Sequence, residues 1–439
     1  MARSSTHRAP RYRPLTLPGA ILAGLLALPA AQAAIIPVKP GESIQAAIDK
    51  AQPGDVVEVQ RGRYEENLRI EKTITLRGIN RPRVSGGDKD DTIRVTAPDV
   101  VIEGMIVSDS GGSLLKQNAG IYIQPGAHRA KVQNCWLNYN LFGLWIEKAD
   151  DVLVLNNNIT GKRDYDSAQR GNGVQLYNTK GAKIIGNQVS FVRDALYIDV
   201  SHHAEFKQNN MHHSRYGTHY MNSYYNVWED NDTWANRSGL ALMEVRDQVV
   251  RNNRAWDNLD HGIMLRTLQD AVVENNVVMR NGRGFFVYDV EYTKLTGNVV
   301  ADNKIGVHLS GSARNEVDGN DFIGNQEQIK YIGTRDTEWG GKQGNYWSNY
   351  RGWDRDSDGR GDVSYEANDV VDRLSWRYPM VRLLLASPAV QVLRMVGQQF
   401  PVLRVPSVVE KNPRMEPATP DWEKWRYMLT RKITHAPKS

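Results

Sequence analysis

Side chains that could bind a soft metal ion recur in the middle of this 439-residue chain. His219 and Met221 are two residues apart, and Met243 and Met264 follow at intervals of about 22 residues. Thioether sulfur and imidazole nitrogen are ligands for Cu(I), and both are poor ligands for Ca²⁺ or Mg²⁺. These four residues therefore predict a site that holds Cu(I) weakly enough to pass it on.

A second group of possible ligands lies in an acidic loop. Carboxylates occupy positions 1, 3, 5 and 9 of the loop and glycine occupies position 6: Asp354, Asp356, Asp358, Asp362 and Gly359. This spacing can wrap oxygen atoms around Ca²⁺, because the glycine permits a sharp bend. Position 12 is Tyr365, where a bidentate glutamate is expected, and Glu366 follows one residue later. The loop predicts either a structural Ca²⁺ site or a hydrogen-bonded acidic turn.

Acid–base cleavage or epimerisation of an acidic polysaccharide is the enzymatic alternative. It requires an acid, a base and a cation near the sugar carboxylate, clustered on one exposed sheet. The nearest candidates are Asp257, Asp260, His261, Asp289 and Glu291. The first three lie in a turn, where aspartate is common. We therefore expect a protein that is not an enzyme, with a polysaccharide-binding or polysaccharide-modifying (lyase or epimerase) protein as the alternative.

A repeated unit of about 22 residues must position these groups. A small residue followed by an apolar–variable–apolar triplet occurs at Gly120, Gly143, Gly173, Ala195, Gly217, Gly239, Gly262, Gly284 and Gly306. The alternation and the β-branched and aromatic residues are typical of strands, and the repeat is typical of stacked coils. We expect an all-β fold, a right-handed parallel β-helix of the pectin-lyase-like solenoid type.

A second repeat, apolar–x–x–Asn, accompanies the first. It ends at Asn187, Asn209, Asn231, Asn252, Asn275, Asn298 and Asn320. Asparagine at an inward turn suits a stacked side-chain ladder at a left-handed corner of the backbone. We therefore expect an asparagine ladder along one corner of the β-helix.

Strand alternation places the four soft ligands on the outside. Positions one and three after each small residue are apolar in nearly every coil, so positions two and four face outward. Met221 and Met243 are then direct neighbours on adjacent coils, with His219 and Met264 beside them. A surface that docks a partner protein by apolar packing would carry the same residues. The two interpretations are compatible, because a metal passed between proteins must lie at an interface.

Other possible ligands favour structural or solvent-exposed roles. The pairs His202-His203 and His212-His213 lie near the corners of neighbouring coils, where histidine is more often solvated than a ligand. Cys135 is the only cysteine, which excludes an internal disulfide framework. It adjoins an apolar residue, so we expect a buried thiol rather than a metal ligand.

Four segments follow from these patterns. Ser43 can cap a short amphipathic helix, Ile44 to Ala51, that closes the first coil. The repeats fade after about Ile332, and composition changes again beyond Pro379. We expect an export signal, the β-helix, a Trp- and Asp-rich segment with the acidic loop, and a helical extension, over residues 1–33, 34–335, 336–378 and 379–439.

The beginning of the chain predicts export to the periplasm. Arginines precede the apolar run from Leu15 to Leu28, and Ala31-Gln32-Ala33 resembles a Sec-type cleavage site. The apolar run is too short to favour a permanent membrane anchor. The net charge of +5 includes several positive charges of this signal, and no basic and aromatic recognition motif is present, so nucleic acid is not an expected partner.

The mature chain resembles the NosD family of periplasmic β-helix accessory proteins, which mature the copper centres of nitrous oxide reductase. The specific likeness lies in the C-terminal third, in Gly344 to Tyr350, Gly352 to Asp362 and Asp372 to Met380. The resemblance implies a non-enzymatic partner of an ABC-type ATPase and its membrane permease. It also implies that a copper-chaperone lipoprotein and nitrous oxide reductase are partners, at the periplasmic side of the inner membrane.

The apolar residues after Pro379 are too numerous for a solvated tail. Arg382, Arg394 and Gln398 interrupt them too often for a membrane span, so a helix here must bury one face. We expect the segment from Val381 to Phe400 to dock on the permease, with a simple C-terminal cap as the alternative. The partner-binding residues would be Val381, Leu384, Val392, Met395 and Phe400.

Overall fold

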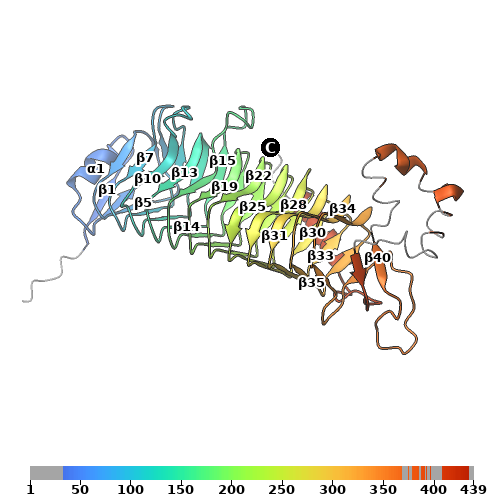
Figure 1. Ribbon diagram of the computed structural model, residues 1–439. Coiled ribbons are helices and arrows are strands. Elements are labelled where there is room, and N and C mark those ends of the chain that lie inside the picture. Colours follow the sequence, from blue (N-terminus) through green and yellow to red (C-terminus); the bar gives the residue numbers. More distant parts are fainter. Residues whose placement is uncertain are drawn as a thin grey trace, which may run out of the picture. The chain divides into compact units, whose positions relative to one another are not determined.

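Coils of about 22 residues fold into a parallel β-helix, as the repeats predict. The computed structural model describes residues 33–367, 374, 378–384, 387–390, 392, 396 and 408–434. Each coil contributes one strand to each of three parallel sheets, and a compact unit extends over Ala34–Ser439. Figure 1 shows the strands stacked coil upon coil along one axis. The predicted export signal lies outside the described residues, except for Ala33.

Three sheets, which we call A, B and C in the order in which the chain first visits them, form the faces of the β-helix. Sheet A contains β1 (Ile35–Val38), β2 (Val56–Val59), β5 (Thr75–Gly78), β8 (Val101–Glu103), β11 (Lys131–Gln133), β14 (Leu153–Leu155), β17 (Lys183–Ile185), β20 (Glu205–Lys207), β23 (Val227–Glu229), β26 (Val249–Arg251), β29 (Val272–Glu274), β32 (Lys294–Thr296), β35 (Glu316–Asp318) and β38 (Glu338–Trp339). Sheet B contains β3 (Arg63–Glu65), β6 (Arg83–Ser85), β9 (Ile106–Ser108), β12 (Trp136–Asn140), β15 (Asn158–Gly161), β18 (Gln188–Ser190), β21 (Asn210–His212), β24 (Asp232–Trp234), β27 (Arg254–Trp256), β30 (Val277–Met279), β33 (Val299–Ala301), β36 (Asp321–Ile323) and β39 (Tyr346–Trp347). Sheet C contains β4 (Leu68–Ile70), β7 (Ile93–Val95), β10 (Ala119–Ile123), β13 (Phe142–Glu147), β16 (Val174–Tyr177), β19 (Asp194–Asp199), β22 (Tyr216–Met221), β25 (Ser238–Arg246), β28 (His261–Gln269), β31 (Arg283–Glu291), β34 (Ile305–Ser310) and β37 (Glu327–Ile332).

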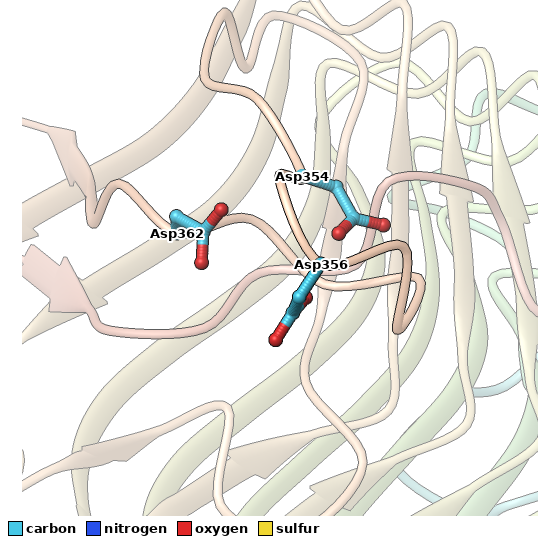
Figure 2. A group of neighbouring side chains, drawn as sticks. All are labelled: Asp354, Asp356 and Asp362. Atoms are coloured by element: carbon cyan, nitrogen blue, oxygen red, sulfur yellow. The ribbon is translucent and has the colours of Figure 1, made fainter.

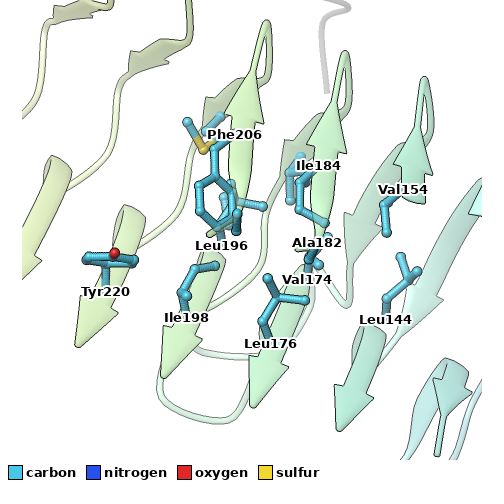
Figure 3. Packing of buried hydrophobic residues seen from close by; sticks show 14 of the residues in the cluster. Leu144, Val154, Val174, Leu176, Ala182, Ile184, Leu196, Ile198, Phe206 and Tyr220 are labelled. Atoms are coloured by element: carbon cyan, nitrogen blue, oxygen red, sulfur yellow. The ribbon is translucent and has the colours of Figure 1, made fainter. Parts of the chain in front are cut away.

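The apolar positions of the repeat fill the interior. Leu144 pairs with Val174 and Val174 with Leu196, so like residues stack from coil to coil. Figure 3 shows these side chains meeting those of sheet A, such as Val154 and Ile184, across the interior. The inward and outward faces predicted for sheet C are therefore confirmed. Cys135 is also buried in this core, and burial raises the pKa of its thiol to about 12, as expected for a structural residue.

The predicted asparagine ladder is present, with two corrections. Asn253 and Asn276 belong to it, whereas Asn252 and Asn275 occupy the preceding corner positions with φ of 56° and 55°. The ladder residues themselves are absent from the left-handed region, because the residue before each one makes the turn. The described ladder comprises Asn157, Asn187, Asn209, Asn231, Asn253, Asn276, Asn298, Asn320 and Asn345.

A second ladder, which was not predicted from the sequence, lines the corner between sheets B and C. Its side-chain amides donate to one another from coil to coil at 2.9–3.1 Å. Its members are Asn258, Asn281, Asn303 and Asn325, and Asn236 joins through its backbone N–H. Buried amides that satisfy both one another and the turn backbone keep successive coils in register.

The first coil is closed by the predicted helix. The helix α1 spans Ile44–Lys50, and Ser43 caps it by accepting a hydrogen bond from the backbone N–H of Ala46. Ile44, Ala47 and Ile48 are buried against the core. The helix ends one residue before the predicted boundary, because Ala51 leaves the helical conformation.

The last coil is closed by a two-stranded antiparallel sheet. β40 (Tyr365–Ala367) pairs with β41 (Val408–Glu410), and Tyr365 stacks on Trp347 with ring centroids 4.3 Å apart. The helix expected over Val381 to Phe400 is described only in part, with a 3₁₀ helix η1 over Pro379–Leu384. A second C-terminal helix, α4 (Glu423–Thr434), packs on the outer face of sheet B, where Leu429 joins Met279 and Trp256 in an apolar cluster.

Candidate functional site

The soft-ligand residues lie on three consecutive strands of sheet C. His219 and Met221 are on β22, Met243 is on β25 and Met264 is on β28. The pair Tyr220–Leu242 immediately precedes Met221 and Met243, which makes these two methionines neighbours across adjacent coils. We call these four residues the Met/His patch.

Met264 lies in the column of His219 rather than in that of Met221. Ala241 pairs with His219 on one side and with Met264 on the other. His219 and Met264 are two coil steps apart, a distance of about 9.5 Å. The side chain of Ala241 between them is short, so the two longer side chains can extend toward each other over it. Met264 is only 8% exposed, while His219, Met221 and Met243 are half-buried. The patch is therefore a sheltered surface rather than a fully solvated one.

A buried carboxylate orients His219. Its Nδ1 lies 3.1 Å from Oδ2 of Asp194, which also forms an ion pair with Arg215. Nδ1 also lies 3.3 Å from Nη2 of Arg215, and its shorter contact with the carboxylate favours the tautomer that carries the proton on Nδ1 and leaves the Nε2 lone pair for a metal. Burial raises the pKa of Asp194, but hydrogen bonds from His219 and Arg215 outweigh it and hold the pKa below its ordinary value. A carboxylate behind the imidazole is the usual support for a metal-binding histidine.

Three of the four aspartates of the acidic loop gather at one point. Ligand oxygens of Asp354, Asp356 and Asp362 all lie within 4.8 Å of one another (Figure 2). Asp358 is outside this group, and its Oδ1 accepts a hydrogen bond from the backbone N–H of Arg360. The charge of Asp358 raises the pKa of Asp356, as expected for crowded carboxylates. A cation would relieve this repulsion.

The same loop is also hydrogen-bonded internally. Asp354 accepts from the backbone N–H groups of Ser357 and Gly359 at 2.7 and 2.8 Å. Burial raises the pKa of Asp354, but these backbone hydrogen bonds hold it below its ordinary value. Tyr365, at the position of the missing glutamate, is buried against Trp347 and therefore does not act as a ligand. The loop therefore combines the internal hydrogen bonds of an acidic turn with the converging carboxylates of a candidate Ca²⁺ site.

Three of the five candidates for acid–base catalysis are engaged in ion pairs and hydrogen bonds. Asp257 binds Arg280 through both carboxylate oxygens, and Asp260 binds Arg237 at 2.7 Å. His261 contacts Ser238 and Arg283 through its two ring nitrogens, at 3.1 and 2.9 Å. Asp289 sits at a left-handed corner.

Two of the predicted partner-binding residues are exposed, although Val390 of the same segment is buried. Leu384 is 57% exposed and Val392 is 56% exposed, and Val381 lies in η1. Met395 and Phe400 lie outside the described residues. Among the described residues, no helix is both long enough and apolar enough to cross a membrane.

Residues far along the chain complete the last coil, and the sequence carries no local signal for them. Glu410 is fully buried and accepts hydrogen bonds from Asn345 and Trp347 at the end of the asparagine ladder. Arg414 binds Asp321 at 2.8 Å, and Arg426 of α4 binds Asp302. The segment around Glu410 to Arg426 is therefore part of the folded β-helix and not a free tail.

Comparison with known proteins gives one consistent family. A family model described as periplasmic copper-binding protein (NosD) matches residues 155–352. The chain is 37% identical over 370 residues to the probable ABC transporter binding protein NosD of Pseudomonas aeruginosa, covering 81% of this chain and 86% of that protein. It is 36% identical over 372 residues to the protein of the same name from Stutzerimonas stutzeri, covering 81% and 85%.

A solved structure supports the fold independently. The family 28 exopolygalacturonase of Yersinia enterocolitica superposes with a TM-score of 0.51 at 10% sequence identity, covering 71% of this chain and 79% of that chain. A likeness at this identity concerns the solenoid alone and carries no information about activity.

Proposed function

Because this chain belongs to the NosD family, we propose that it binds copper in the periplasm as the partner of an ABC transporter. The two curated relatives are named as ABC transporter binding proteins, and the family is described as periplasmic and copper-binding. We further propose that the copper is destined for nitrous oxide reductase and arrives from a chaperone lipoprotein. The observation that carries the proposal is His219, held by Asp194 beside Met221 and Met243.

The Met/His patch suits transient Cu(I). Thioethers and one imidazole are soft, mostly neutral ligands, which suit Cu(I) better than hard cations. The partial burial of the patch also disfavours hard cations, because they would be poorly solvated there. The aromatic ring of Tyr197, 4.7 Å from the His219 ring, shields the site on one side. Met221 and Met243 are partly open to solvent. This leaves room for a further ligand from the protein that delivers or receives the copper ion.

Replacement of Met221, Met243 and Met264 by Leu is expected to weaken Cu(I) binding by at least about tenfold, or ~1.4 kcal/mol. Leucine keeps the volume and apolarity of methionine but lacks the thioether. Titration of the purified mature protein against a Cu(I) chelator measures the change. The control is Met279→Leu on sheet B, a buried methionine outside the patch. Unchanged affinity in the triple variant would place the copper elsewhere. Lost copper with partner binding intact would show that the patch is more than an apolar docking surface.

The acidic loop is proposed to hold Ca²⁺ as a structural clamp, since three carboxylates converge there. Addition of about 1 mM Ca²⁺, the range of extracellular calcium modules, should raise the melting temperature of a chelator-treated sample. Asp356→Ala should abolish the rise. Asp358→Ala should keep most of it, because Asp358 lies outside the converging group. If calcium does not change the melting temperature of the parent protein, the loop is a hydrogen-bonded acidic turn and not a Ca²⁺ site.

The segment from Val381 to Phe400 is proposed to dock on the permease. The role of a cap is already filled by β40, β41 and Glu410, while Leu383 and Leu384 remain exposed. Truncation after Pro379 would also remove β41 and α4, so it cannot separate docking from folding. Replacement of Leu383, Leu384 and Val392 by Ser should abolish co-purification with the permease without lowering the melting temperature. If co-purification is lost and the melting temperature also falls, the segment is part of the fold and not a docking surface.

A further inference from the structure

A histidine pair on sheet B is packed more tightly than its corner position suggests. His212 ends β21 and is only 9% exposed, while His213 follows at a left-handed corner with φ of 54°. The two Nδ1 atoms lie 2.8 Å apart. One ring donates its Nδ1–H to the other. Solvation, the interpretation that the sequence favours for such pairs, does not fit His212.

Aromatic neighbours hold both rings in place. The His212 ring stacks on Trp234 at 4.4 Å, and Trp234 is itself fixed by donation from Nε1 to Oδ1 of Asn210 at 2.8 Å. The His213 ring stacks on Phe191 at 5.0 Å. The two imidazole planes are nearly perpendicular, at 83°, so the rings meet through their nitrogen atoms and not through their faces. This preorganisation lowers the ordering cost of any ligand that takes both nitrogens.

The surroundings of both rings favour the neutral form. Burial is the main cause, and it lowers the pKa of His212 to about 4, helped by the neighbouring His213 and Arg163. The pKa of His213 is also lowered, first by burial and then by Arg163. Metal binding to histidine requires the neutral ring.

We propose that Nδ1 of His212 and Nδ1 of His213 chelate a divalent copper ion at a site separate from the Met/His patch. Imidazole nitrogen is a favoured ligand for Cu²⁺, and Cu²⁺ prefers square-planar or tetragonal geometry. Two nitrogens about 2.0 Å from a metal are about 2.8 Å apart at a right angle but about 3.3 Å apart in a tetrahedron. The observed separation of 2.8 Å is that of a hydrogen bond between the rings, and it places both nitrogens within reach of one ion.

Chelation requires a change of tautomer and a rotation of the His213 ring. The proton on Nδ1 of the donating ring moves to Nε2 of the same ring, which frees both Nδ1 lone pairs and leaves each imidazole neutral. A small rotation of the exposed His213 ring then directs its lone pair to the metal. His212 lines a pocket of about 220 Å³ together with Asn158, Gln188, Ser190, Phe191 and Arg163 among others, and we expect the remaining coordination positions to open toward it. Its polar side chains suit water or an exogenous ligand in those positions.

The charge around the pair limits its affinity. The Arg163 guanidinium lies 4.1 Å above the Phe191 ring that stacks on His213, and no carboxylate belongs to the described lining of the pocket. A nearby positive charge disfavours a bound cation and favours an anionic ligand on the open side. We therefore expect a labile site that receives or releases copper, and not a permanent structural centre.

The test is Cu²⁺ titration of the purified mature protein, monitored by electron paramagnetic resonance. The parent protein should show one tetragonal Cu²⁺ with coupling to two imidazole nitrogens. His213→Asn should lose this signal and weaken Cu²⁺ binding at least tenfold, and asparagine tolerates the left-handed corner. His212 is left unchanged because its stack with Trp234 supports the fold.

The matched control is His203→Asn. His203 follows His202 as His213 follows His212, has the same φ of 54°, and stacks on Tyr225 at 5.1 Å. Nδ1 of His202, however, accepts from the backbone N–H of Tyr224 at 3.1 Å, so this pair does not form the same contact. The control should keep the signal. An absent two-nitrogen signal in the parent, or equal loss in both variants, would overturn the proposal.

This inference extends the proposed copper-binding function, and the two can fail separately. The Met221, Met243 and Met264 triple Leu variant should keep the Cu²⁺ signal while losing Cu(I). His213→Asn should keep Cu(I) binding. If the triple variant binds neither Cu(I) nor Cu²⁺, the histidine pair is not an independent site. If Cu(I) binding is absent from the parent but the Cu²⁺ signal is present, the histidine site stands without the patch.

Discussion

Asn253→Ala is expected to destabilise the protein by about 3–5 kcal/mol. The side chain is fully buried and makes four hydrogen bonds. Its Nδ2 donates to the Trp228 carbonyl and to Asn276, and its Oδ1 accepts from the backbone and side-chain N–H groups of Asn231. Alanine leaves buried backbone groups without partners, and each such group costs about 1–3 kcal/mol. Urea unfolding followed by circular dichroism measures the loss.

The neighbouring asparagine is the control. Asn252 makes the left-handed corner with φ of 56° and takes no part in the ladder. Asn252→Gly should therefore change stability by less than about 1 kcal/mol, since glycine adopts this conformation freely. Equal losses in the two variants would mean that the tandem asparagines share one role. Hydrogen exchange in the coils on either side of Asn253 should locate the damage, because solenoid repeats are stabilised by their neighbours.

The architecture was predictable because the repeat is local. Core residues such as Leu144 and Val174 and the outward positions of sheet C follow from a two-residue alternation and a 22-residue period. The period cannot choose between adjacent asparagines, however. In Asn252-Asn253 and Asn275-Asn276 either residue matches the apolar–x–x–Asn pattern, and the prediction took the first. The inward side chain is the second, because the first makes the turn.

The candidate sites were predictable only in part. Alternation correctly placed Met221 and Met243 side by side, but it could not reveal that Asp194 orients His219 from the preceding coil. Nor could it show that His212 and His213 converge, because side-chain rotamers decide that contact. The side-chain hydrogen bonds of Glu410 join residues 63 or more positions apart, a separation at which sequence pattern gives no signal.

Glu410→Ala is expected to cost about 2–4 kcal/mol and to loosen the C-terminal segment. The carboxylate accepts from the backbone and side-chain N–H groups of Asn345 and from Nε1 of Trp347, at 2.6, 3.0 and 2.8 Å. It thereby ends the asparagine ladder, whose last donors would otherwise be buried without an acceptor. Thermal unfolding measures the stability, and limited proteolysis between residues 408 and 434 reports the loosening.

Glutamine at position 410 should have an intermediate effect. Its oxygen can still accept from the side chains of Asn345 and Trp347, but its NH₂ group would face the backbone N–H of Asn345. Burial raises the pKa of Glu410 in spite of its hydrogen bonds, so a neutral amide also escapes part of the penalty of burying a charge. The exposed Glu416→Gln should have no measurable effect. Any other order of the three variants would contradict the capping role.

This cap also changes what the exposed segment can be. Because β40 and β41 pair antiparallel at the last coil, the chain leaves from Ala367 and returns at Val408 to the same place. The residues proposed to dock on the permease therefore belong to a loop held at both ends, not to a free tail. Arg414 with Asp321 and Arg426 with Asp302 hold the returning arm. Glu410→Ala should consequently weaken permease binding through loss of this anchorage, even though Glu410 is buried and contacts no partner.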